Sequence, residues 1–133
     1  MYFYISKEIP VSSISFIDWG RDLVVVYIIV KVDGAKHTVS VYNAYNLGPE
    51  APYNKRLYGT PTNSCLPRLD AALFRSRRNS KIVVGDFNLW DEMWGGEEAE
   101  EAVRSGGGGG GSRASCRLLK EIVERHDLRL LLP

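Results

Sequence analysis

The stretch Leu23-Val-Val-Val-Tyr-Ile-Ile-Val30 decides how this chain folds. Its almost unbroken run of β-branched and aromatic residues predicts a central strand that is covered on both faces. Asp33-Gly34 follows as a hairpin signal, and residues 36–46 then read as a returning strand. We therefore expect these two segments to pair antiparallel.

Further elements are predicted outward from this hairpin. Upstream, Tyr2–Ile5 and Ser13–Ile17 have the composition and alternation of short strands. Downstream we expect a helix over Leu66–Phe74 with one apolar side, a buried strand at Lys81–Val84, a second amphipathic helix and a last strand. The supporting residues are Leu66, Leu69, Leu73 and Phe74 for the first helix, Leu118, Leu119, Ile122 and Val123 for the second, and Leu128–Leu132 for the strand. This order predicts a layered α/β fold.

Composition bounds the class of protein. The 133 residues suit one domain, and 44% hydrophobic with 25% charged residues argues against wholesale disorder. A net charge of +1 excludes a protein held to nucleic acid by bulk charge alone. No apolar run is long enough for a membrane helix, the start does not resemble a secretory signal, and two cysteines make no disulfide framework. We therefore expect an intracellular protein that does not bind membranes.

Two segments are not expected to form regular structure. Residues 47–67 contain four prolines. Residues 97–112 are rich in Glu and Gly and should form a flexible insertion, either natural or engineered.

Gly85-Asp86-Phe87-Asn88 is the tetrapeptide most suggestive of chemistry. In an extended backbone, Asp86 and Asn88 would project from one face at the carboxyl end of their strand, where ligands commonly bind. The carboxylate could deprotonate a water, and the amide could donate to a phosphate oxygen. The alternative is a polar turn that ends a buried strand.

The strand over residues 36–46 offers a second set of polar groups near its end. Asn43 and Tyr45 should share one face, while Tyr42, Ala44 and Asn46 share the other. A phenol here could donate to a phosphate oxygen, or it could simply be an amphipathic core residue.

Together these segments resemble the endonuclease/exonuclease/phosphatase superfamily, particularly the endonuclease domain of fungal LINE-type non-LTR retrotransposons. The resemblance is carried by the order of Val39-Ser-Val-Tyr-Asn-Ala-Tyr-Asn46, a Pro-rich loop, a short helix and Lys81-Ile-Val-Val-Gly-Asp-Phe-Asn-Leu89. Trp94-Gly95-Gly96 and the segment Glu124–Pro133 are also similar.

The resemblance implies a fold, a reaction and a set of site residues. The fold would be an α/β sandwich of two layers of mostly antiparallel sheet flanked by helices. The reaction would be Mg²⁺-dependent hydrolysis of phosphodiester bonds in DNA, in the nucleus, in an element that also encodes a reverse transcriptase. Asp86, Asn88 and Tyr45 match the catalytic residues, and Asp86 also the metal ligand; Asn43, Asn46 and Trp90 are expected to bind substrate.

Departures from the family pattern are equally informative. This sequence has no counterpart of four features of the family: its metal-binding glutamate, an upstream asparagine, a further aspartate and a terminal Ser-Asp-His. In addition, Trp90-Asp91 stands where the fungal members commonly have a His-His pair. We therefore expect residues 1–133 to be a partial domain that is inactive or weakly active alone. One alternative is a non-catalytic remnant that acts as a binding module and could self-associate through exposed sheet edges. The other is a branch of the superfamily that acts on lipid headgroups or sugar phosphates.

Basic residues collect in the middle third of the chain. They could contact a DNA backbone or form an ordinary solvated face; they are Lys55, Arg56, Arg68, Arg75, Arg77, Arg78 and Lys81. His126 is expected at a helix end, and Cys65 and Cys116 as small buried residues.

Overall fold

The computed structural model describes residues 3–20, 22–46, 65–89 and 110–131. The chain divides into two compact units, Met1–Tyr45 with Pro67–Asp86, and Asn46–Leu66 with Phe87–Pro133. The expected loop between 47 and 64 and most of the Glu/Gly-rich insertion lie outside the described residues. Among the helices that are described, none combines the length and apolar character needed to cross a membrane.

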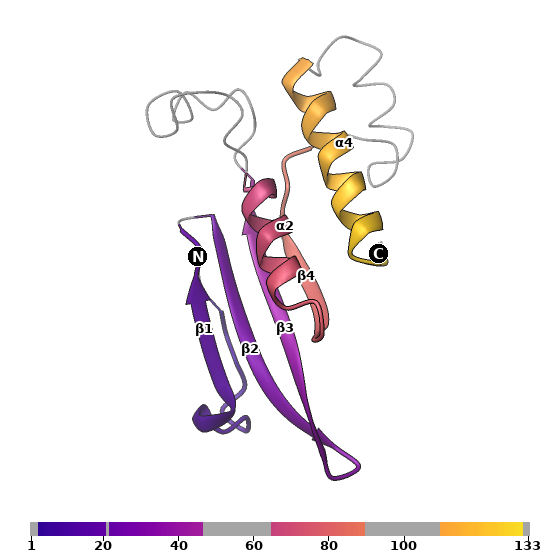
Figure 1. The fold of residues 1–133 in the computed structure, drawn as a ribbon. Helices are drawn as coiled ribbons and strands as arrows, with labels where there is room; N and C mark the ends of the chain where they lie inside the picture. Colours follow the sequence, from indigo (N-terminus) through magenta and orange to yellow (C-terminus); the bar gives the residue numbers. More distant parts are fainter. Residues whose placement is uncertain (1–2, 21, 47–64, 90–109, 132–133) are drawn as a thin grey trace. The chain divides into compact units, whose positions relative to one another are not determined.

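The first unit is built on a four-stranded sheet in the order β1-β2-β3-β4 (Figure 1). A short 3-10 turn, η1 (Val11–Ser13), leads into β1 (Ile14–Asp18), which pairs antiparallel with β2 (Leu23–Val32). β2 pairs antiparallel with β3 (Ala35–Tyr45), as the sequence predicted. β4 (Ser80–Asp86) then lies parallel to β3. The mixed α/β class is therefore confirmed.

Asp33 and Gly34 alone connect β2 to β3. Their φ angles are 50° and 82°, so both residues occupy the left-handed region. Two consecutive positive φ angles match the right-handed twist of the strands on either side, and Asp-Gly adopts them at low cost. The hairpin register follows from this turn, with Val32 opposite Ala35.

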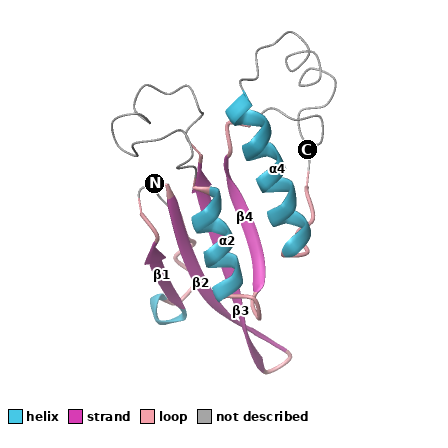
Figure 2. Ribbon diagram, turned by 45° about the horizontal axis from the view of Figure 1, so that its top comes forward, coloured by secondary structure: helices cyan, strands magenta, loops and turns pink. Residues whose placement is uncertain are grey.

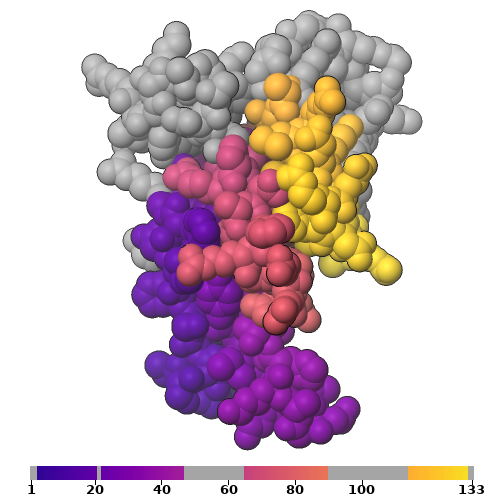
Figure 3. All heavy atoms as spheres, viewed as in Figure 1, coloured from indigo at the N-terminus to yellow at the C-terminus, as the bar shows by residue number. Residues whose placement is uncertain are grey.

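Helix α2 (Leu66–Arg75) covers one face of this sheet (Figure 2). It buries Leu69, Ala72 and Leu73, and the strand residues Val25 and Tyr42 are fully buried as well. The space-filling view shows rose atoms of α2 against the indigo atoms of the first strands (Figure 3). The sequence prediction was wrong for Phe74, which is 60% exposed, whereas Ala72 takes its place in the apolar stripe.

Strand β4 was predicted to be buried, and this is wrong. Its Ile82 and Val84 side chains are 50% and 45% exposed. Both side chains lie on the face of the sheet opposite α2, and β4 is also the last strand among the described strands. An apolar run cannot by itself distinguish a central strand from an edge strand.

Two further predicted strands are absent. The described part of the first segment, Phe3–Ile5, and the described part of the last, Leu128–Leu131, are irregular. Tyr4 is 98% exposed and Leu131 is 89% exposed. Both segments have suitable composition, but neither has a partner strand in the sheet, and strand propensity without a partner is a weak signal.

In the second unit, α4 (Gly110–Arg125) confirms the predicted helix and extends it upstream. It begins at Gly110, so the end of the expected flexible insertion is helical instead. Cys116, Leu119 and Ile122 are its buried residues.

The carboxyl end of α4 is closed by its own backbone. Leu128 N–H donates to Val123 C=O at 2.9 Å, and Asp127 N–H donates to Glu124 C=O at 3.2 Å. Asp127 has φ 51°, so this is a Schellman motif with Asp127 at the left-handed position. His126 therefore lies at the helix end, as predicted.

Candidate functional site

Tyr45 and Asp86 lie next to each other at one end of the sheet. They are register partners on β3 and β4, although 41 positions separate them in the sequence. The two strands are parallel and both end here, and side chains of register partners leave the same face of a sheet. Tyr45 is 42% exposed, and Asp86 is also exposed. A phenol and a carboxylate are thus presented together at the carboxyl ends of parallel strands, where α/β proteins commonly bind ligands.

Gly85 permits this close pairing. A Cβ atom at Gly85 would collide with the backbone carbonyl of Ala44 on β3. The residue also has φ 157°, a value that side chains disfavour. Glycine is therefore required immediately before Asp86, because the backbones of β3 and β4 approach too closely there to leave room for a side chain.

Asn43 belongs to the same face of β3 as Tyr45. It lies two residues earlier, is half-buried, and is in register with Val84 of β4. The predicted alternation is confirmed here, since Tyr42 and Ala44 are buried on the face that α2 covers. Asn43 adds an amide to the surface on which Tyr45 and Asp86 stand.

A partly buried ion pair borders Tyr45, and the sequence analysis did not identify it. Asp22 C=O accepts a hydrogen bond from Tyr45 N–H at 2.8 Å. The Asp22 carboxylate pairs with Arg68 of α2, Nη2 to Oδ2, at 2.8 Å. The Asp22 side chain is 8% exposed and the Arg68 side chain 35%. The only signal in the sequence was a charged residue directly before a strongly apolar strand.

Trp19 also lies in the turn that leads into β2. Its Nε1 atom is buried and has no hydrogen-bond partner among the described residues. Gly20 next to it has φ 111°, and a Cβ there would lie 2.9 Å from Arg68 Nη1. The turn is thus shaped closely around the arginine that pairs with Asp22.

Asn46 and Asn88 come together in the second unit. Asn88 Nδ2 donates to the backbone carbonyl of Asn46 at 2.8 Å. Asn46 is 1% exposed; its Nδ2 donates to Phe87 C=O at 2.8 Å, and its Oδ1 accepts from Cys65 N–H at 3.3 Å. Both ends of the Asn46 amide therefore hold backbone segments together.

The backbone does not remain extended as far as Asn88. β4 ends at Asp86, and Asn88 has φ 48°. The prediction that strand alternation places Asp86 and Asn88 on one face was therefore wrong in its premise. Asn tolerates the left-handed region better than most residues, which gives Asn88 a conformational role at this position.

Trp90, predicted to bind substrate, lies outside the described residues. Within the part of the chain that the structure describes, no group of three or more His, Cys, Asp or Glu side chains could hold a metal ion. Asp86 supplies a carboxylate to the candidate site. A single carboxylate suits Mg²⁺ when water and substrate phosphates supply the other ligands.

No protein-family model, curated protein or solved structure matches this chain.

Proposed function

We propose that the chain carries part of the catalytic site of a metal-dependent DNA endonuclease, of the type found in retrotransposon-encoded enzymes. The pairing of Tyr45 with Asp86 is the observation that supports it most directly. It brings together two of the residue types that phosphodiester hydrolysis needs, a carboxylate and a hydrogen-bond donor, at a favourable edge of the sheet. A nuclear location goes with this proposal.

Each residue has a defined task in the proposed reaction. The Asp86 carboxylate would orient a water molecule and accept its proton as the water attacks phosphorus. The phosphorus–oxygen ester bond to the leaving sugar would break, and the leaving oxygen would take a proton from solvent water. The Tyr45 hydroxyl would donate a hydrogen bond to a non-bridging phosphate oxygen, where negative charge increases in the transition state. Asn43, on the same face, would contact the substrate backbone. Mg²⁺ bound by Asp86 and phosphate oxygens would supply further charge neutralisation.

The same residues predict low activity for the chain alone. A second metal-binding carboxylate and a terminal histidine have no counterpart in the sequence. Catalytic groups that act as a unit lose most of their effect together when members are missing. These missing groups favour, as the second candidate, a non-catalytic module that binds nucleic acid.

Metal binding at Asp86 tests the proposal without requiring turnover. Mn²⁺ is a paramagnetic substitute for Mg²⁺ and broadens NMR signals near its site. With a short DNA duplex present, Mn²⁺ should broaden the amide signals of Tyr45 and Asp86 in the wild-type chain, and Asp86→Asn should abolish this effect. Asp33→Asn is the matched control, because Asp33 is also exposed but lies in the hairpin turn. Equal effects of the two substitutions, or no broadening near Asp86, would refute the proposal.

Plasmid nicking then tests the prediction that the chain alone has little or no activity. With Mg²⁺ and supercoiled plasmid, we expect the 133-residue chain to nick no faster than its Asp86→Ala variant. Clear nicking that Asp86→Ala abolishes would show instead that the chain is a sufficient catalyst.

A further inference from the structure

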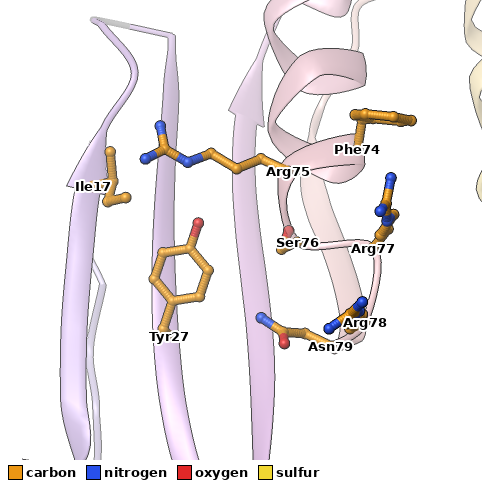
Figure 4. Close-up of a pocket in the computed structure, with 8 residues that line it drawn as sticks. All are labelled: Ile17, Tyr27, Phe74, Arg75, Ser76, Arg77, Arg78 and Asn79. Atoms are coloured by element: carbon orange, nitrogen blue, oxygen red, sulfur yellow. The ribbon is translucent and has the colours of Figure 1, made fainter.

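The opposite end of the first unit carries a hollow lined by arginines. It has a volume of about 590 Å³ and lies between the strands and the turn that connects α2 to β4. We call it the arginine hollow; its lining includes Tyr27, Phe74, Arg75, Arg77, Arg78 and Asn79. Figure 4 shows Arg75 extending from the end of α2 toward Ile17, and the Tyr27 hydroxyl pointing up toward Arg75.

Its positive charge is not neutralised locally. Within the described residues, Arg75, Arg77 and Arg78 form no ion pair with a carboxylate. The strand residues that line the hollow, Ile17 and Tyr27, are uncharged, and the carboxylate of the next β1 residue, Asp18, accepts a hydrogen bond from Gly20 N–H at 2.8 Å. Arg75, Arg77 and Arg78 lie within four consecutive residues, so this turn carries three positive charges that attract an anion.

The carboxyl end of α2 repels an anion, but this repulsion is much weaker than the attraction of the three arginines. The carboxyl end of α2 carries about half a negative charge from its unpaired carbonyl groups. Three guanidinium groups outweigh this several-fold. Arg75 and Arg78 are both exposed, so their heads can move onto a ligand.

Uncharged groups in the hollow define the ligand further. Asn79 Nδ2 donates to Ser40 Oγ at 2.9 Å, which fixes the Asn79 side chain at the base. The Tyr27 hydroxyl forms no hydrogen bond within the described part of the chain, and its ring is half-buried. Arg77 already stacks on Phe74, with 5.3 Å from its Cζ to the ring centroid. The hollow thus offers exposed guanidinium groups, a phenol hydroxyl with no partner among the described residues, and an aromatic surface.

We infer that the arginine hollow binds the phosphate group of a nucleotide, either free or as one unit of a strand. Guanidinium groups match phosphate geometry and form its strongest hydrogen bonds. A hollow of about 590 Å³ is within the range that holds such a ligand. Tyr27 would donate its hydroxyl to the phosphate or stack its ring on the base.

This site is separate from the Tyr45–Asp86 site. The hollow borders the start of β4, whereas Asp86 is its last residue. Six residue steps along a strand span roughly 20 Å, which a single nucleotide cannot bridge. The inference does not depend on the proposed function.

The test measures binding of AMP, inorganic pyrophosphate and a ten-nucleotide oligo-dT to the full chain. In NMR titrations, AMP should shift the amide signals of residues 75–79 and of Tyr27 in the wild-type protein. Arg75→Gln/Arg78→Gln should weaken binding of each probe by about tenfold or more, and Tyr27→Phe by about threefold. The matched control, Lys31→Gln/Lys36→Gln, removes the same charge from exposed residues on the β2–β3 hairpin and should change affinity less than about twofold.

Each outcome decides the inference. Oligo-dT binding much more tightly than AMP would identify a strand as the ligand, and equal affinities would identify a free nucleotide; both support the site. No shift at residues 75–79 with any probe, or equal losses in the arginine and lysine variants, would overturn it. The wild-type titration needs no substitution, so a variant that fails to fold leaves the test intact.

Discussion

At the scale of single residues, Tyr42 connects the sheet to α2. Its ring is fully buried, and its hydroxyl bonds with Ser76 Oγ and donates to Ala72 C=O at 3.5 Å. Ser76 Oγ also donates to Ala72 C=O at 2.9 Å. Tyr42→Phe keeps the ring but leaves Ser76 with one partner fewer, so the free energy of unfolding should fall by about 1 kcal/mol at pH 7. Urea unfolding measures this, and Tyr4→Phe, at a 98% exposed residue, should change nothing.

The same substitution has a predictable pH dependence. Burial raises the pKa of Tyr42 above its usual value of about 10, and this outweighs the opposite effect of its hydrogen bonds to Ser76 and Ser40. A raised pKa means that the folded state favours the neutral phenol. The contribution of Tyr42 to the free energy of unfolding is complete below the pKa that it has in the unfolded chain. It is lost as pH rises above about 10 toward the higher pKa that it has in the folded chain. The stability difference between wild type and Tyr42→Phe should therefore narrow above pH 10, and a constant or widening difference would contradict this.

The residues of the candidate site could be predicted from the sequence, but their adjacency could not. Tyr45 and Asp86 were identified from a motif and a resemblance, but their adjacency depends on the parallel register of β3 and β4. No local pattern encodes that register, because it is fixed by how β4 returns to the sheet after α2. The arginines after α2 form a basic cluster that can be recognised in the sequence. That Tyr27 lines the same hollow can be known only from the structure.

At the scale of elements, α2 provides a direct test of which residues hold it to the sheet. Leu69 is 1% exposed, whereas Phe74 is 60% exposed. Leu69→Ala should destabilise the protein by about 2–5 kcal/mol through lost burial and a cavity. Phe74→Ala should cost less than about 1 kcal/mol, mainly from its stacking with Arg77. Chemical unfolding of both variants measures the difference, and similar losses would place Phe74 in the core after all.

Elements were predictable where two signals agreed. β2 and β3 had both strand composition and the Asp33-Gly34 turn, which fixes their partner and register. α2 and α4 had apolar residues at helical spacing, and both are present. Phe3–Ile5 and Leu128–Leu131 had composition alone, and neither is a strand. Composition measures suitability for a sheet, but a strand also needs a neighbour, and that neighbour is set by the whole chain.

At the scale of the whole molecule, the exposed edge of β4 leads us to expect self-association. It is an edge strand among the described strands, and exposed apolar side chains, Ile82 and Val84, lie along it. An edge strand can pair with its own copy about a two-fold axis, because the same backbone groups then face each other in antiparallel order. We therefore predict that a second copy of the chain binds along β4 and that a dimer forms as concentration rises.

Sedimentation analysis of matched variants tests this prediction. Val84→Lys places a charge on the pairing edge, and it should shift the chain toward monomer because two copies would bring these lysines close together. Val11→Lys makes the same chemical change at an 86% exposed residue in η1, outside the sheet, and should dimerise like the wild type. A wild-type chain that stays monomeric at every concentration would rule out pairing along β4. Equal loss of dimer in both variants would assign the association to general surface charge, because only a contact along β4 makes the position of the lysine matter.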